Sequence, residues 1–339
     1  MPGKIPVIDV HSHVLPRSLI EAIAARPREH EIKVETRDDG GVKRFLRDDG
    51  HATPIFDEFH DPAAKVAGME RKGIDVSILS TTPFVFFYWL APERALAAAR
   101  ITNDGIAQMV AAYPDRLRGM ATLPMQDADA AIAELERVVR DHGFRALEVG
   151  CTVQGQQLSE ARFRPILKRA AELGVCLFAH PHFVGGVRSP LECWYLANLI
   201  GHPLDTVLMA SHLMFSGTLD ELPDLNIILA HGGGYLPYQI GRLAHGHDCR
   251  TETKAQTKTS PLDLLRRFWC DALTHDAIAL RYLVDRVGAD RVVLGTDAPY
   301  DMGEEDPLGM LEQLTGLSNA QRDQIHGLNA LALLGETPR

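Results

Sequence analysis

Ile8-Asp9-Val10-His11-Ser12-His13 forms the first predicted strand of this chain and ends it with two histidines. Alternate side chains of a strand point to the same face, so His11 and His13 face the same way. Neutral imidazole is a common ligand of zinc and of similar divalent ions. The stretch therefore predicts part of a metal site. The alternative is a chance His-x-His pair with one histidine in the core.

A helix followed by a short apolar strand recurs through the rest of the chain. Predicted helices at 62–72, 95–112, 128–142, 160–173, 191–213, 262–267 and 278–287 precede predicted strands at 76–80, 117–123, 146–150, 175–179, 226–230, 268–270 and 292–295. With the first strand, this alternation favours an α/β fold of the (β/α)8 TIM barrel type over an open doubly wound sheet. The sequence contains no G-x-G-x-x-G fingerprint and no phosphate loop, which weakens a nucleotide-binding alternative.

Residues 19–60 depart from this alternation because they are polar and interrupted. Residues 32–46 alternate around Asp38-Asp39-Gly40-Gly41, which is a strong hairpin signal. We expect residues 1–339 to form a single metal-dependent barrel domain. Residues 19–60 would be a small insertion after strand 1, with a hairpin, that covers the active-site mouth.

The amino-acid composition limits the kinds of partner and the cellular compartment that we expect for this protein. The chain has 339 residues and a net charge of −10, which argues against a nucleic-acid partner. It has no apolar run of the roughly 18 to 20 residues that a membrane span needs, so we expect no membrane partner. The cysteines are scattered without a Cys-x-x-Cys pair, which fits a reducing compartment and predicts a cytoplasmic protein.

Polar residues that directly follow barrel strands lie on the catalytic rim. Strand one ends in His11 and His13, strand five in His180, strand six in His231 and strand eight in Asp297. Side chains from four strand ends would thus converge on one mouth. A mixed set of imidazoles and a carboxylate with an open position is typical of a catalytic divalent site.

The glycines after His231 have a second interpretation. His231-Gly232-Gly233-Gly234 resembles the oxyanion-hole tetrad of esterases, but the chain lacks a G-x-S-x-G nucleophile elbow. We expect the glycines to let the backbone approach the substrate closely.

The ordered set of motifs resembles the amidohydrolase superfamily, and within it the branch of metal-dependent non-oxidative decarboxylases. The resemblance runs through nearly the whole chain. Its motifs are Ile8-Asp9-Val10-His11-Ser12-His13-Val14-Leu15-Pro16, Ser80-Thr81-Thr82-Pro83, Tyr88-Trp89, Leu123-Pro124-Met125-Gln126, His180-Pro181, His231-Gly232-Gly233-Gly234, Gly241-Arg242 and Gly295-Thr296-Asp297.

The resemblance implies one divalent metal ion and no organic cofactor. Zn2+ is the expected ion and Mn2+ the alternative, because nitrogen and carboxylate ligands accept both. The implied ligands are His11, His13, His180 and Asp297, with His231 as the neighbouring acid/base and Asp297 also serving catalysis.

Binuclear members of the superfamily carry a carboxylated lysine at the end of strand four, where this chain has Glu148. One ion is therefore expected, and Glu148 as a ligand of a second ion stays open.

The resemblance also implies that Arg242 and Arg250 hold the carboxylates of a small-molecule substrate, one of them donated across a homodimer interface. Guanidinium offers two parallel hydrogen bonds to a carboxylate. Arg47 is the candidate third arginine and Arg44 competes with it. An ordinary surface arginine is the alternative at each position.

The pocket wall departs from the resembled family. His182-Phe183 replaces Trp-Asp, Ala197 replaces a pocket tryptophan, and Ala298-Pro299-Tyr300 replaces Tyr-Pro-Phe. Tyr300 is expected to contact substrate. His182 has three open roles, as an acid/base group, a substrate contact or a packing residue.

The sequence thus predicts a metal-dependent decarboxylase of an unsaturated or aromatic carboxylic acid. The rivals are a hydrolase of an amide or lactone and a barrel that binds metal without catalysis.

Overall fold

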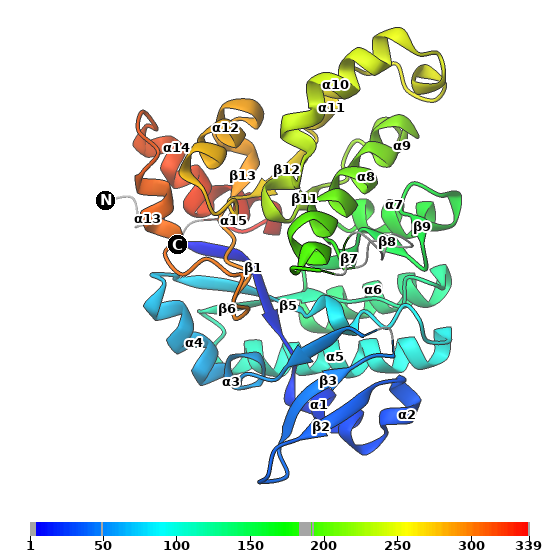
Figure 1. The fold of residues 1–339 in the computed structure, drawn as a ribbon, viewed down its shortest axis with the longest axis vertical. Coiled ribbons are helices and arrows are strands. Elements are labelled where there is room, and N and C mark those ends of the chain that lie inside the picture. Colours follow the sequence, from blue (N-terminus) through cyan, green and yellow to red (C-terminus); the bar gives the residue numbers. More distant parts are fainter. Residues whose placement is uncertain (1–4, 49, 183–190, 192, 338–339) are drawn as a thin grey trace.

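The computed structural model describes residues 5–48, 50–182, 191 and 193–337. Eight parallel strands form its central sheet (Figure 1). In spatial order they are β1 (Ile8–Val14), β5 (Val76–Thr81), β6 (Leu117–Ala121), β7 (Ala146–Gly150), β10 (Cys176–His180), β11 (Ile227–Leu229), β12 (Phe268–Asp271) and β13 (Val292–Val293).

The segment after β13 closes the sheet against β1. The amide of Val10 donates to the Leu294 carbonyl at 2.9 Å, and the amide of His13 donates to the Ala298 carbonyl at 2.8 Å. Because the first and last strands meet in this way, the predicted TIM barrel is confirmed.

Helices surround the barrel, and a helix precedes each strand of the barrel after the first. These are α4 (Pro62–Arg71), α5 (Pro92–Ala112), α6 (Ala128–His142), α7 (Arg164–Glu172), α8 (His202–Phe215), α11 (Pro261–Leu265) and α12 (Ala277–Val287). Aspartates fix several of their starts: the side chains of Asp61, Asp127 and Asp276 accept backbone N–H groups of α4, α6 and α12. Further helices are α9 (Thr218–Glu221), α10 (Leu236–Cys249), α13 (Pro307–Glu312), α14 (Asn319–Asp323) and α15 (Asn329–Leu334).

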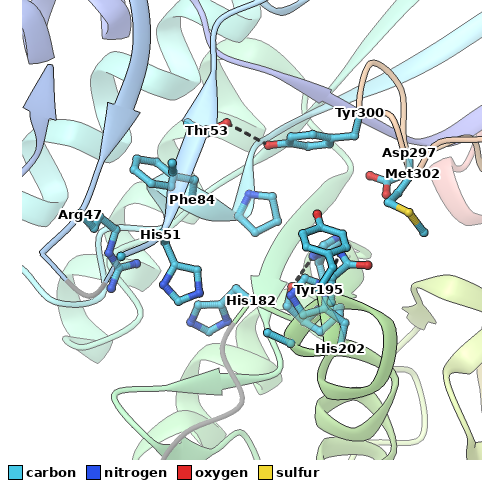
Figure 2. Close-up of a pocket in the computed structure, with 17 residues that line it drawn as sticks. Arg47, His51, Thr53, Phe84, His182, Tyr195, His202, Asp297, Tyr300 and Met302 are labelled. Carbon is cyan, nitrogen blue, oxygen red and sulfur yellow. Dashed lines mark hydrogen bonds between the residues drawn. The ribbon is translucent and has the colours of Figure 1, made fainter. Parts of the chain in front are cut away.

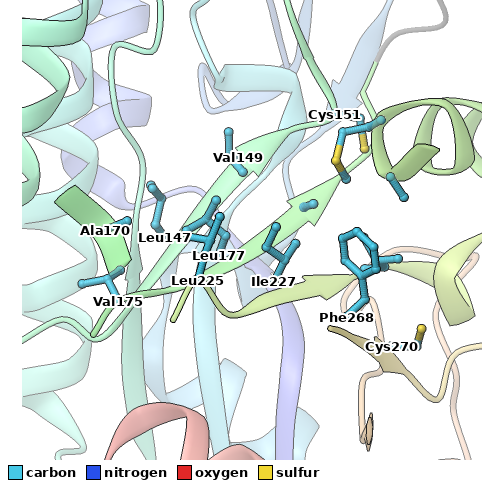
Figure 3. Close-up of a cluster of buried hydrophobic side chains, with 14 of the residues drawn as sticks. Leu147, Val149, Cys151, Ala170, Val175, Leu177, Leu225, Ile227, Phe268 and Cys270 are labelled. Atoms are coloured by element: carbon cyan, nitrogen blue, oxygen red, sulfur yellow. The ribbon is translucent and has the colours of Figure 1, made fainter. Parts of the chain in front are cut away.

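Successive side chains of the barrel strands point to opposite faces of the sheet, and they form two separate hydrophobic cores. Leu147 and Leu177 belong to the core between strands and helices (Figure 3). Their neighbours Ala146 and Phe178 belong to a second core, which collects side chains from other barrel strands as well as from α15. Since α15 packs on residues near the start of the strands, the carboxyl ends remain available for polar side chains.

The insertion after β1 contains the predicted hairpin. Strands β2 (Lys33–Thr36) and β3 (Val42–Leu46) pair antiparallel, and a third strand, β4 (Ala52–Pro54), extends the sheet. The hairpin is confirmed, and β4 was not predicted. Short helices flank the sheet: α1 (Arg17–Ala25), α2 (Pro27–His30) and α3 (Asp57–His60). A separate core under this sheet includes buried Phe45 and Phe59, with Tyr300 packed against it.

The predicted helix at 191–213 starts too early. The backbones of Trp194 and Tyr195 are left-handed, with φ of 55° and 62°, which a helix cannot accommodate. In the described part, a π-helical turn at Ala197–Gly201 leads into α8. A small hairpin of β8 (Thr152–Val153) and β9 (Gln156–Gln157) follows β7.

None of the helices in the described ranges is both long enough and apolar enough to cross a membrane.

Candidate active site

Five predicted site residues meet at the carboxyl ends of the barrel strands. Ligand atoms of His11, His180, His231 and Asp297 lie within 4.8 Å of one another. Nε2 of His13 lies 3.0 Å from Oδ1 of Asp297 and 3.2 Å from Nε2 of His11. The structure therefore brings the whole predicted set together, from segments that are far apart in the sequence.

Hydrogen bonds from the Nδ1 atom hold the rings of three of these histidines in one orientation. Nδ1 of His11 donates to Asp271 at 2.7 Å, that of His13 to the Thr81 carbonyl at 2.9 Å, and that of His180 to the Pro181 carbonyl at 2.6 Å. In the neutral ring the proton then sits on Nδ1, which leaves the lone pair on Nε2 free for a metal.

These lone pairs fit a divalent cation. Among the described residues, the buried Nε2 of His180 has no hydrogen-bond partner. The Nε2 atoms of His11 and His13 face each other at 3.2 Å, close to the Asp297 carboxylate. Two bare lone pairs this close repel each other unless a positive charge lies beside them. Three imidazole nitrogens and a carboxylate oxygen form a donor set that suits Zn2+ and Mn2+.

The pKa shifts of His11 and Asp297, at the centre of the site, agree with a site that attracts a cation. Burial acts to lower the pKa of His11, but the carboxylates of Asp297 and Asp271 outweigh it and raise the pKa to about 10. Burial acts to raise the pKa of Asp297, but His11, His13 and His231 hold it well below its usual value. The site therefore carries an ionised carboxylate that attracts positive charge.

His231 lies at the edge of this group and has a strained backbone. Its φ is 56° and that of Asp297 is 59°, a left-handed conformation that costs energy outside glycine and concentrates at functional sites. Nε2 of His231 lies 3.7 Å from Oδ2 of Asp297. A Cβ on Gly234 would lie 2.5 Å from the Pro203 carbonyl oxygen, so the glycines allow this loop to pack closely on the start of α8.

Asp271 is a site residue that the sequence analysis missed. Its Oδ2 contacts His11, and its Oδ1 accepts the backbone N–H of Gly232 at 2.8 Å and of Leu273 at 3.2 Å. It is the last residue of β12 and directly follows the predicted strand at 268–270, so its place at a strand end is the signal that could have found it.

Lys65 and Glu148 are buried beside the ligands. Nζ of Lys65 donates to the carbonyls of His13 at 3.0 Å and Ala298 at 3.3 Å, which ties β1 to the loop after Asp297. Burial raises the pKa of Glu148 well above its usual value. Both carboxyl oxygens of Glu148 are buried without a hydrogen-bond partner among the described residues, and Nδ1 of His13 is bonded to the Thr81 carbonyl, so Glu148 as a ligand of a second ion remains a prediction.

A cavity of about 300 Å³ opens beside Asp297 and His180. Arg47 and Tyr300 line it (Figure 2). The guanidinium of Arg47 lies 3.9 Å from the centre of the Trp89 ring, a cation–π contact that holds it at the cavity wall. Arg44 instead pairs with Glu35 at 2.6 Å on the surface. The structure thus favours Arg47 over Arg44 as the residue that reaches the pocket.

Arg242 and Arg250 do not line this cavity in the described chain. Both are exposed, Arg242 on α10 and Arg250 just after it, and Arg250 pairs with Glu252 at 2.8 Å. Their predicted contact with substrate would need a second copy of the chain.

Three further histidines line the cavity: His51, His182 and His202. Only His182 attracted notice in the sequence. Burial lowers the pKa of His182 to about 3, with Arg47 adding to the effect, and burial with His231 lowers the pKa of His202 to about 3. The ring of His202 stacks toward His231 with centroids 6.3 Å apart. Both rings are therefore neutral at neutral pH.

Comparisons with known proteins agree with this geometry. The amidohydrolase family model matches residues 8–335. A 2-amino-3-carboxymuconate-6-semialdehyde decarboxylase of Dictyostelium discoideum is 34% identical over 98% of this chain and 92% of its own length. A gamma-resorcylate decarboxylase of a Polaromonas species is 31% identical over 78% of this chain and 85% of its own.

A solved structure shares the fold. The crystal structure of a dihydroxybenzoic acid decarboxylase from a Polaromonas species, with bound manganese and the inhibitor 2-nitroresorcinol, has a TM-score of 0.76 and 27% identity, and the match covers 99% of this chain and 97% of that one. The resemblance inferred from the motifs is confirmed, and the chain belongs to the amidohydrolase family, in its branch of metal-dependent decarboxylases.

Proposed function

We propose that this protein is a carboxy-lyase: a metal-dependent, non-oxidative decarboxylase of an unsaturated or aromatic carboxylic acid. One observation carries the proposal. Imidazole nitrogens and a carboxylate converge beside a cavity with a guanidinium in its wall, in a chain whose relatives are named as decarboxylases. That combination offers both a cation site and an anchor for an acidic substrate.

The residues that would hold the ion are His11, His13, His180 and Asp297. When bound, a divalent ion supplies positive charge that orients and polarises the substrate and stabilises the electrons left when carbon dioxide departs. We propose zinc, with manganese as the alternative, since a related structure contains manganese.

The chain's own residues bind the substrate and move a proton. Loss of carbon dioxide breaks a carbon–carbon bond and leaves its electron pair on the substrate carbon, which must then gain a proton. His231 is the proposed proton donor, and the Asp297 carboxylate 3.7 Å from its Nε2 stabilises the protonated ring. Arg47 would bind a substrate carboxylate, and the aromatic sides formed by Phe84 and Tyr300 would hold a flat unsaturated acid.

We propose in addition that Arg242 or Arg250 reaches the cavity of a second copy in a homodimer. Both side chains are exposed, so they are available for such a contact. The proposed location is the cytoplasm, with which the five free cysteines are consistent.

The test is substrate turnover by protein of defined metal content. The protein is stripped with a chelator and reloaded with Zn2+ or Mn2+. It is then incubated with hydroxylated benzoates and with amino- and semialdehyde-bearing unsaturated acids, and carbon dioxide release is followed alongside hydrolysis of amides and lactones. Release from at least one acid, lost on stripping and restored on reloading, supports the proposal. Hydrolysis without carbon dioxide release from any acid would replace it with the hydrolase alternative.

A further inference from the structure

The barrel closes at an irregular seam, formed by β1 and residues 294–298, and Asp297 lies in it. β13 has two residues and pairs with β12, and after it the backbone passes through Asp297 in a left-handed conformation, with φ of 59°. Among the described residues, one isolated bridge, Ser12 to Ala298, continues the sheet across the seam. The regular ladder therefore stops before Asp297, and side chains complete the connection to the strand that carries His11 and His13.

Asp9 joins the two sides of the seam. Its Oδ2 accepts the hydroxyl of Thr296 at 2.7 Å, and its Oδ1 accepts the backbone N–H groups of Thr296 and His11, each at 3.0 Å. All three partners donate, and an ionised carboxylate is a group that only accepts. The Thr296 hydroxyl in turn accepts the backbone N–H of Ala298 at 3.2 Å. One buried carboxylate thus holds the backbone on both sides of Asp297.

Lys65 brings the opposite charge from α4. Its side chain is buried, and its Nζ donates to one carbonyl on each side of the seam, that of His13 at 3.0 Å and that of Ala298 at 3.3 Å. Burial lowers the pKa of Lys65 to about 8, and the attraction of Asp9 opposes this effect. Buried opposite charges contribute little to stability compared with apolar residues of similar volume. Stability alone therefore does not account for this lysine, whose contacts lie on the two segments that carry proposed ligands.

We propose that Asp9, Thr296 and Lys65 are positioning residues of the metal site. They act through the backbone, and they hold Oδ1 of Asp297 at 3.2 Å and 3.0 Å from the Nε2 atoms of the two histidines of β1. Ligands that are already in place bind an ion more tightly, because binding then costs less ordering of the protein. The inference rests on the proposed function, in which Asp297 and these histidines hold the ion.

The experiment measures metal affinity with two variants at one position. Thr296→Val keeps a β-branched side chain but removes the hydroxyl that bonds to Asp9. We expect its dissociation constant for Zn2+, measured by competition with a chelating dye, to rise about tenfold. Thr296→Ser keeps the hydroxyl and should bind Zn2+ as the wild type does. Co2+ is a second probe, because its visible absorption depends on the geometry of its ligands. The valine variant should change that spectrum, and the serine variant should not.

Thr102→Val is the matched control. Thr102 is buried on α5, and its hydroxyl donates to the Ala98 carbonyl at 2.8 Å, so this variant also loses a buried hydrogen bond, but within an outer helix. It should lower the Tm and leave both the Zn2+ affinity and the Co2+ spectrum unchanged. Lys65→Met keeps the length of the side chain without its charge and should weaken Zn2+ binding at least as much as Thr296→Val. If Lys65→Met does not fold, the variants of Thr296 still decide.

Two outcomes would overturn the inference. One is a Thr296→Val protein that folds and binds Zn2+ and Co2+ as the wild type does. The other is an equal loss of Zn2+ affinity in Thr102→Val, which would make the effect one of general stability. Weaker Zn2+ binding by Thr296→Val, in a protein that decarboxylates none of the acids, would support this inference while the proposed function fails. Wild-type protein that binds no ion would reject the ligand set and this inference together.

Discussion

The carboxylate of Asp271 joins His11 to the loop that carries His231. Its Oδ2 accepts from Nδ1 of His11 at 2.7 Å, and its Oδ1 accepts from the N–H of Gly232 at 2.8 Å. One buried side chain thus orients a proposed metal ligand and also the backbone next to the proposed acid/base. An anionic partner on Nδ1 makes the opposite nitrogen of the ring a stronger ligand.

We therefore predict that Asp271→Asn lowers metal affinity about 10-fold to 100-fold. The amide still accepts a hydrogen bond but carries no charge, so His11 becomes a weaker ligand. Competition with a chelating dye measures the dissociation constant. Asp248→Asn, exposed on α10, is the control. Unchanged affinity in the Asp271 variant would show that this contact is not what makes His11 a ligand.

His231 lies within the group of potential ligand atoms, so its role has to be separated from metal binding. We predict that His231→Gln retains one ion per chain but loses a factor of about 100 to 10,000 in kcat, the usual contribution of a general acid. Elemental analysis and steady-state kinetics provide the two measurements. His180→Ala should lose the ion together with the activity. Loss of the ion from the His231 variant as well would make His231 a ligand.

Away from the site, Asp104 on α5 accepts hydrogen bonds from His142 and Arg137 on α6, each at 2.8 Å. Burial acts to raise the pKa of Asp104, but these two bonds outweigh it and the pKa is lowered. A carboxyl with a lower pKa in the folded state stabilises the fold above its ordinary value of 3.8, and this contribution is lost as the pH falls through the folded value.

Asp104→Asn should therefore lower the Tm at pH 7 by a small amount. The carboxyl is half-exposed, so the loss should be under about 1 kcal/mol, which for a chain of this size is about 1 to 3 °C. The difference from wild type should narrow in acid. Thermal melts at several pH values measure it, with Asp38→Asn in the hairpin turn as control. A gap that widens toward low pH would contradict the sign.

The sequence was sufficient for the proposed ligands because each one lies in a barrel strand or shortly after its end. Strand ends can be located from apolar runs and turns, and the barrel then places all carboxyl ends at one mouth. His11, His180 and Asp297 could be grouped for this reason. Asp271 directly follows the predicted strand at 268–270, so the same rule would have found it.

The pocket wall could not be predicted in the same way. His202 begins α8 after a π-helical turn, and His51 lies in a loop of the insertion. Neither follows a barrel strand, so no local pattern indicates that it faces the cavity. Their positions depend on long-range packing, such as the close contact of Gly234 with Pro203. Motif positions therefore predicted the reaction better than the substrate.

Variants of Arg242 and Arg250 test whether one copy of the chain contributes an arginine to the active site of another copy. If one of them reaches the cavity of a second copy, its change to alanine should raise KM about tenfold or more, the cost of a charged hydrogen bond, with metal content unchanged. Arg286→Ala, another exposed arginine, should leave KM as it is.

Mixing variants gives the decisive result. His231→Ala and Arg242→Ala proteins, each inactive or weak, would form mixed dimers in which one site has both an intact His231 and an intact Arg242. Random reassortment makes half of the dimers mixed and half of their sites intact, so the mixture should recover about a quarter of wild-type activity. The same mixture with Arg250→Ala distinguishes the two arginines. If neither mixture recovers activity, no arginine is shared, and Arg47 is left as the proposed carboxylate anchor within the chain itself.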